Sequence, residues 1–191
     1  MSVSLHEGEP GHHLQESFIN TQKNIPAFRR YIEDRKNSDS PSRFPLYTAY
    51  IEGWALYSEY LGLELGLFKD PYFRLGRLSE EICRACRLVV DTGIHAFGWS
   101  REKGVNYLLE HTSYNIKNIE NEIDRYITWP GEVCSYKIGE LKIKELRKRA
   151  EKELGNKFYI KDFHDVILRN QGPLTLLEKQ VNIYIQQYRQ Q

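Results

Sequence analysis

A histidine-glutamate pair followed by two further histidines lies close to the start of the chain. Residues 6–13 read HEGEPGHH. Hydrolytic zinc chemistry needs such groups, because two imidazoles can hold the metal and an adjacent carboxylate can take a proton from the water that the metal acidifies. The common motif, HExxH, places its histidines four residues apart on one helix face. Here Pro10 stands four residues after His6, so a second histidine must reach the metal in another way.

The Pro10-Gly11 step offers such a route. On an unbroken helix His12 would lie roughly 240° round the axis from His6, and His13 would lie about 10.5 Å along it, so neither could share a metal with His6. Proline removes a backbone donor and glycine admits unusual dihedrals, so we expect a break at this step. The break can return His12 to the metal, although the spacing leaves open whether His12 or His13 is the second ligand. A helix N-terminus with incidental histidines is the alternative.

A third ligand is expected from residues 51–59, which read IEGWALYSE. Glu52 follows His12 by forty residues, and Gly53 beside it can clear space for a close approach of two helices. Trp54 and Tyr57, on the same segment, are expected to pack around the metal. Glu59 lies two turns after Glu52 on the same helix face and could bond a metal-bound histidine from behind. The alternative is an ordinary amphipathic helix with exposed glutamates.

Several blocks along the chain together resemble the bacterial family of domain of unknown function number 885. They are HEGEPGHHLQ, EGWALYSE, DTGIHAFGW, EIDRYITWPG, SYKIGELKIKELR and DFHDVILRNQGPL. That family is similar to the gluzincin zinc peptidases, whose helical members include angiotensin-converting enzyme. The resemblance implies His6, His12 and Glu52 as Zn²⁺ ligands and Glu7 as the general base. It also implies a longer protein, in which this chain is the C-terminal catalytic portion and a helical N-terminal part forms the other wall of the cleft.

Five more residues could act near the chemistry. Tyr136 lies in SYKIG, which resembles the Tyr-x-x-Gly segment that supplies an oxyanion donor in helical gluzincins; the loss of such a donor raises the barrier by about 3 kcal/mol. Packing is the alternative role for this tyrosine. Arg125 with Tyr126 could clamp a substrate carboxylate, or Arg125 could form a structural ion pair. His95 fits a core position and a substrate-facing position equally. His13, if it is not a ligand, is expected in the second shell.

Helical periodicity runs through the rest of the chain, and we expect one all-α domain over residues 1–191, a multi-helical array resembling the catalytic half of helical gluzincins. No segment alternates with the period of a strand. Leu75, Leu78, Ile82, Cys86 and Val89 are expected on the inner side of one long helix. Polar residues 34–43 are the best loop candidate. Helices are predicted over residues 10–25, 28–33, 47–65, 72–97, 101–110, 115–127, 136–154, 162–170 and 174–187.

Composition narrows the classes of function. Lys plus Arg number 27 against 26 for Asp plus Glu, so no basic surface marks a nucleic-acid partner. The sequence shows no signal peptide and no transmembrane segment. The chain as it stands is expected in the cytoplasm, while the compartment of a longer protein stays open. Cys83, Cys86 and Cys134 are an odd count. Cys83 and Cys86 form a CxxC without a second one, and we expect two small buried side chains there rather than a metal or redox site.

These features predict Zn²⁺-dependent hydrolysis of peptide bonds; short peptide substrates are implied by the resemblance. Two alternatives remain open. The chain could be a truncated fragment that binds zinc without turning over substrate. It could also be a metal-dependent amide or ester hydrolase, because the metal site sets the reaction and not the substrate. A missing N-terminal half would leave a face of the chain uncovered, so self-association is a further expectation.

Overall fold

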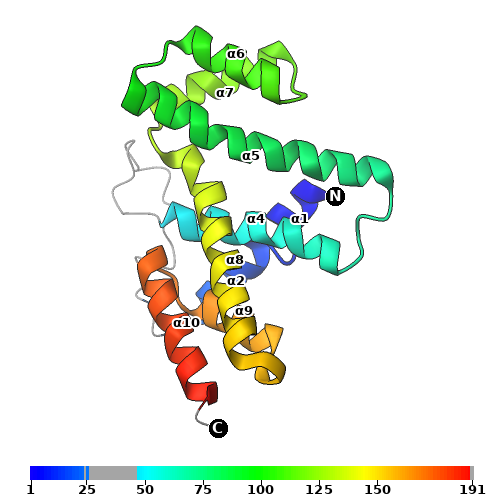
Figure 1. Cartoon of the computed structure of the whole chain (residues 1–191), viewed down its shortest axis with the longest axis vertical. Coiled ribbons are helices and arrows are strands. Elements are labelled where there is room, and N and C mark those ends of the chain that lie inside the picture. Colours follow the sequence, from blue (N-terminus) through cyan, green and yellow to red (C-terminus); the bar gives the residue numbers. More distant parts are fainter. Residues whose placement is uncertain (24, 26–46, 190–191) are drawn as a thin grey trace.

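The computed structural model describes residues 1–23, 25 and 47–189, and these residues form helices joined by short turns, without any strand among them (Figure 1). The predicted all-α fold is confirmed. The helix expected over residues 28–33 and the loop expected over residues 34–43 lie outside the described residues. The α-helices are α1 (Ser2–Glu7), α2 (His12–Thr21), α4 (Thr48–Glu64), α5 (Pro71–Phe97), α6 (Arg101–His111), α7 (Ile116–Thr128), α8 (Ser135–Leu154), α9 (Ile160–Arg169) and α10 (Leu174–Arg189), and two short 3₁₀ helices are η1 (Glu132–Cys134) and η2 (Gly155–Lys157).

Side-chain caps fix where the middle helices begin. The Asp70 side chain accepts a hydrogen bond from the backbone of Tyr72, and Pro71 occupies the first position of α5, where its missing donor costs nothing. Ser100 caps α6 and Asn115 caps α7, both residue types that favour this position. The helix boundaries therefore follow from local sequence, within one to two residues for most of these elements.

Helices α4 and α8 cross with their backbones in contact, and this crossing positions the segment that carries Glu52 (Figure 1). A Cβ atom added to Gly53 would lie 2.5 Å from the Cα atom of Gly139, which is closer than real side chains approach. Glycine at both positions therefore permits the crossing. The prediction that Gly53 clears space is right, but the space is cleared for α8 and not for the helix that carries His6.

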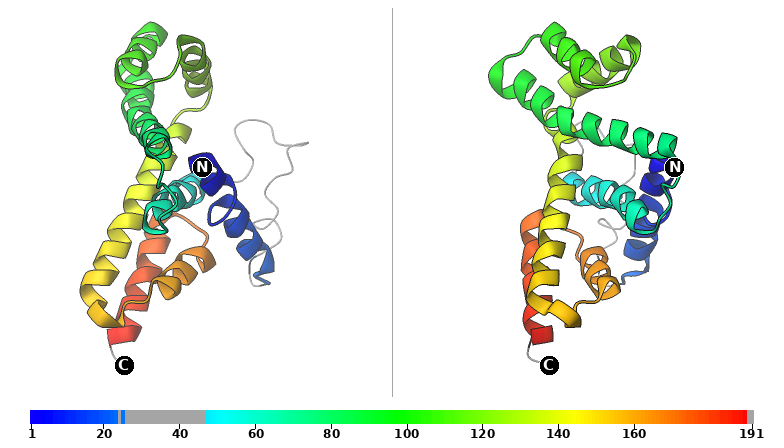
Figure 2. Two further views of the ribbon diagram at one scale, coloured as in Figure 1. Left: turned by 90° about the vertical axis from the view of Figure 1, so that its right-hand side faces the viewer. Right: turned by 45° about the vertical axis from the view of Figure 1, so that its right-hand side comes forward.

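Two hydrophobic clusters hold the chain together, one on each side of this crossing. In Figure 2, α9 and α10 lie along the lower part of α8, and α6 and α7 lie against one end of α5. The first cluster joins α2, α4, α8, α9 and α10, and Trp54 and Tyr57 are completely or almost completely buried in it. The second joins α5, α6, α7 and η1. The three cysteines are buried and free, and the burial predicted for Cys83 and Cys86 is confirmed. Among the described helices none is long and apolar enough to cross a membrane.

The expected inner face of α5 is confirmed for Cys86, which is buried, and is wrong for the other residues named. Leu75, Leu78 and Ile82 are 65%, 54% and 45% exposed, and Val89 is 39% exposed. The side of α5 that turns toward α1 and α4 instead carries Arg84 and other buried polar residues. Periodicity identifies which residues share a face, but it does not identify which face other elements cover, and here the charged face is the buried one.

Candidate metal centre

A tight turn between α1 and α2 brings the two histidines together. The Trp54 indole of α4 donates a hydrogen bond of 2.8 Å to the carbonyl oxygen of Pro10 and so holds the turn against α4. A Cβ atom on Gly11 would lie 1.9 Å from the His6 carbonyl oxygen, so only glycine fits there. The His6 and His12 rings lie 4.9 Å apart between centroids. The predicted break is present: Gly11 has φ −77° and ψ −134°, outside the helical and extended regions, and its missing side chain permits the close approach.

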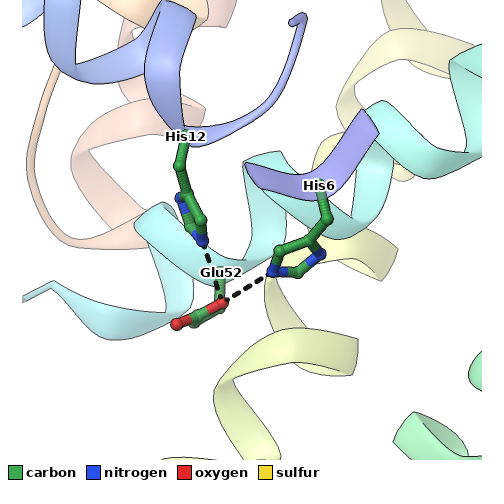
Figure 3. A group of neighbouring side chains, drawn as sticks. All are labelled: His6, His12 and Glu52. Atoms are coloured by element: carbon green, nitrogen blue, oxygen red, sulfur yellow. Dashed lines mark ion pairs between the residues drawn. The ribbon is translucent and has the colours of Figure 1, made fainter. Parts of the chain in front are cut away.

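The side chains of His6, His12 and Glu52 converge from three different helices (Figure 3). The Nε2 atoms of His6 and of His12 each lie 3.4 Å from Oε2 of Glu52, and the ligand atoms of all three residues lie within 4.8 Å of one another. A tetrahedral zinc ion with bonds of about 2.0–2.1 Å separates its ligands by roughly 3.4 Å. The buried Oε2 of Glu52 also has no hydrogen-bond partner. This donor set and its spacing fit a zinc ion.

Glu59 supports His6 from the side away from Glu52. Its carboxylate is 2% exposed and its Oε1 lies 2.8 Å from Nδ1 of His6. Ser2 donates a second hydrogen bond to this carboxylate, and a guanidinium nitrogen of Arg84 lies 3.7 Å away. A proton held on Nδ1 by Glu59 leaves the Nε2 lone pair directed toward Glu52 and His12, as metal binding requires. The sequence placed Glu59 on this face, and the structure bonds it to His6.

The electrostatics of the group favour a cation. Burial opposes protonation of His6, but its polar contacts with Glu52 and Glu59 and their negative charges outweigh it and raise the pKa of His6 to about 9. Burial likewise opposes ionisation of Glu52, but the adjacent His12 and His6 lower its pKa to about 2. At neutral pH, without a metal, a proton on His6 therefore sits between two carboxylates. A metal cation in the group would replace that positive charge.

Tyr136 lies beside this group at the start of α8. Its ring is stacked on the His6 ring with 6.1 Å between centroids, and the Arg87 guanidinium lies 4.8 Å from the Tyr136 ring. Burial raises the pKa of Tyr136 to about 12, helped by the negative charges of Glu52 and Glu132. The phenol therefore stays protonated near neutral pH and keeps an O–H to donate. The structure brings Tyr136 to the group, while its catalytic role stays a prediction.

His13 and Glu7 are both exposed. His12 and not His13 joins the group that could hold a metal, so the geometry favours His12 as the second ligand. His13 lies outside the group, which leaves its predicted second-shell role without support from a contact. Glu7 is the last residue of α1 and directly follows His6. Its role as the general base stays a prediction.

The three residues expected to bind substrate belong to a network between α5 and α7. Tyr126 is completely buried, donates from its hydroxyl to Glu122 at 2.8 Å and accepts from Arg87 at 3.0 Å. Arg125 donates to the same carboxylate at 3.0 Å. The His95 ring contacts the carbonyl oxygen of Tyr126 at 2.9 Å. Tyr126 thus presents no exposed surface to a substrate in this arrangement, and Arg125 is engaged by an ion pair.

Arg87 is the residue of this region that the sequence analysis missed. It is 8% exposed, pairs with Glu122 at 2.9 Å and lies against the rings of both Tyr126 and Tyr136. It therefore links the network between α5 and α7 to the tyrosine beside His6. In the sequence, Arg87 is an arginine on a helix that is otherwise apolar on one side. This pattern does not predict which residues the arginine contacts.

Residues 1–181 match the family described as "Bacterial protein of unknown function (DUF885)". The chain belongs to this family. A "putative lipoprotein" of Colwellia psychrerythraea has a solved structure that is similar over 97% of this chain, with 41% identity and a TM-score of 0.86. A "putative lipoprotein of unknown function" of Shewanella oneidensis is similar over 93% of the chain, with 20% identity and a TM-score of 0.77, which shows a shared fold. The chain spans 30% of each of these two proteins. None of the curated proteins compared with it matches.

Proposed function

We propose that this DUF885 chain carries the metal centre of a Zn²⁺-dependent hydrolase that cleaves peptide bonds, with short peptides as substrates. One observation carries the proposal: two imidazole nitrogens each lie 3.4 Å from one carboxylate oxygen, and a buried second carboxylate holds one of the imidazoles. Two histidines and a glutamate form a known donor set of catalytic zinc sites, which leave a fourth position for water or substrate. The likeness of the sequence motifs to gluzincin peptidases supports the choice of peptide substrates.

The chain supplies residues for each role that such a reaction needs. A zinc ion bound by His6, His12 and Glu52 would polarise the substrate carbonyl and lower the pKa of a bound water to about 7. Glu7, which is exposed beside His6, is the proposed acceptor of the water proton and its donor to the leaving amine. Tyr136 is the proposed donor to the oxyanion, since burial keeps its phenol protonated.

Two other functions remain candidates for specific reasons. The chain spans 30% of the two solved structures, so it could bind zinc and still lack residues that turnover requires. The second candidate is an amide or ester hydrolase, because the same donor set serves several carbonyl substrates. A substrate panel separates it from a peptidase.

The test uses the Glu7→Gln variant, with Glu9→Gln as its matched control, because Glu9 is also exposed and lies in the turn two residues on. Zinc content and turnover of a panel of peptides, amides and esters are measured for both variants and for the unmodified chain. We expect all three proteins to hold zinc and only Glu7→Gln to lose peptide turnover. Turnover that survives Glu7→Gln would contradict the proposed mechanism, and zinc without any turnover by the unmodified chain would favour the inactive fragment.

A further inference from the structure

An exposed apolar stripe runs along the first half of α5. Leu75, Leu78 and Ile82 follow one another at intervals of three and four residues, so they share one face of the helix. Each has about half or more of its side chain exposed. Tyr72, one turn before Leu75, is 81% exposed. We name these four residues the α5 stripe. A contiguous exposed apolar surface of this kind marks an interaction site more often than chance exposure of single residues does.

The α5 stripe continues a face that is already an interface farther along the same helix. Cys86 lies one turn after Ile82, and Val90 lies one turn after Cys86; both are buried in the cluster formed with α6 and α7. The Ser79 hydroxyl is hydrogen-bonded at 2.6 Å to Ser113, in the connection between α6 and α7. Figures 1 and 2 show α6 and α7 against the C-terminal half of α5, and no other described helix beside its N-terminal half on the side away from α1 and α4.

The opposite side of α5 contacts the metal centre. Arg84 and Arg87 lie roughly 120–180° round the helix from Leu75. Arg84 reaches the carboxylate of Glu59, and Arg87 lies over the ring of Tyr136. A helix docked on the α5 stripe would therefore contact α5 on the side opposite the candidate metal centre, and it would not contact that centre itself.

The two solved relatives are longer than this chain and contain parts that have no counterpart in it. The chain spans 30% of the Colwellia and Shewanella proteins and superimposes closely on the former, so some 70% of a protein of that length lies outside the chain. Helices pack by fitting apolar ridges at spacings of three and four residues into matching grooves. We propose that the α5 stripe is the docking surface for a helix that belongs to this remaining part in a protein as long as the relatives. That helix would extend the layer formed by α6 and α7. This inference does not depend on the proposed function.

Thiol labelling tests it directly, because the three native cysteines are buried. A single reporter is introduced as Leu78→Cys in this chain, and also in a hybrid in which the chain replaces the matched 30% of the Colwellia protein. Leu141→Cys on α8 is the matched control, since Leu141 is 52% exposed and Leu78 is 54% exposed. Labelling at residue 78 should be at least about tenfold slower in the hybrid than in the isolated chain, whereas labelling at residue 141 should not change, because a buried thiol reacts only after local opening.

Equal labelling rates at residue 78 in the two proteins would overturn the proposal. Slow labelling in the isolated chain that becomes slower with rising protein concentration would also overturn it, because a second copy would then cover the stripe. A second measurement uses Leu78→Glu, which should lower the unfolding temperature of the hybrid and leave that of the isolated chain unchanged. An unchanged unfolding temperature in the hybrid would count against docking at this face.

Discussion

Replacing Glu59 by glutamine should weaken zinc binding without changing a proposed ligand. The carboxylate is 2% exposed and lies 2.8 Å from Nδ1 of His6. Glutamine keeps the size and one acceptor oxygen but loses the negative charge that makes the His6 imidazole more basic. The loss of such a supporting partner typically lowers metal affinity 10–100-fold, which corresponds to about 1.4–2.7 kcal/mol.

The fold should tolerate the Glu59→Gln substitution. Arg84 is the buried cation that Glu59 accompanies, and it forms a second ion pair with Glu80. The guanidinium is therefore not left as an unpaired buried charge, which is the situation that costs several kcal/mol. A folded variant makes the zinc affinity a measure of the support given to His6.

Competition with a coloured zinc chelator measures the affinity at a fixed pH above about 9, where His6 has no proton for zinc to displace, and circular dichroism checks the fold. The matched control is Glu64→Gln, on the same helix, because Glu64 pairs with Arg147 at the surface and lies away from His6. We expect the control to bind zinc as tightly as the unmodified chain. If folded Glu59→Gln protein showed unmodified affinity as well, the structure-based role of Glu59 would be refuted.

Three more predictions concern protonation, packing and turnover. Because zinc must displace the proton of His6, whose pKa is raised to about 9, zinc affinity should rise about tenfold per pH unit from pH 7 until that pKa is reached; a flat profile in calorimetry would contradict this. Gly53→Ala puts a Cβ 2.5 Å from the Gly139 Cα atom and should lower the free energy of unfolding in urea by about 1–3 kcal/mol. Gly76→Ala, where a Cβ meets no atom within 4 Å, should instead stabilise α5 by about 0.5–1 kcal/mol. Equal unfolding midpoints for the two variants would count against the close crossing. Tyr136→Phe should keep zinc and lower kcat by roughly 10²–10³-fold, and unchanged kcat would assign the phenol to packing alone.

The parts of the candidate site that the sequence predicts are those governed by local geometry. The break after Glu9 follows from proline and glycine chemistry, and it brings His12 to His6 as expected. Glu52 and Glu59 share a helix face because they are seven residues apart, and the structure places each against His6. Ser100 caps α6, and this too depends only on local sequence, because serine favours the position directly before a helix.

The parts that the sequence did not predict depend on which surfaces meet. Helix α1 has six residues, too few to show a periodic pattern. Leu75, Leu78 and Ile82 were assigned to the core because their spacing is that of a core face, yet all three are exposed among the described residues. Arg87 meets Glu122 and Tyr126 across 35 and 39 positions of sequence, and no local rule pairs residues over that distance.

Metal analysis of the Glu52→Ala variant tests the central claim most directly, with His13→Ala as the control because His13 is exposed beside the proposed ligand His12. The proteins are dialysed against the same zinc buffer and their bound zinc is measured per folded chain. The geometry predicts close to one zinc per chain for the unmodified protein and for His13→Ala, and almost none for Glu52→Ala. Full zinc occupancy in folded Glu52→Ala protein would contradict a centre formed by His6, His12 and Glu52.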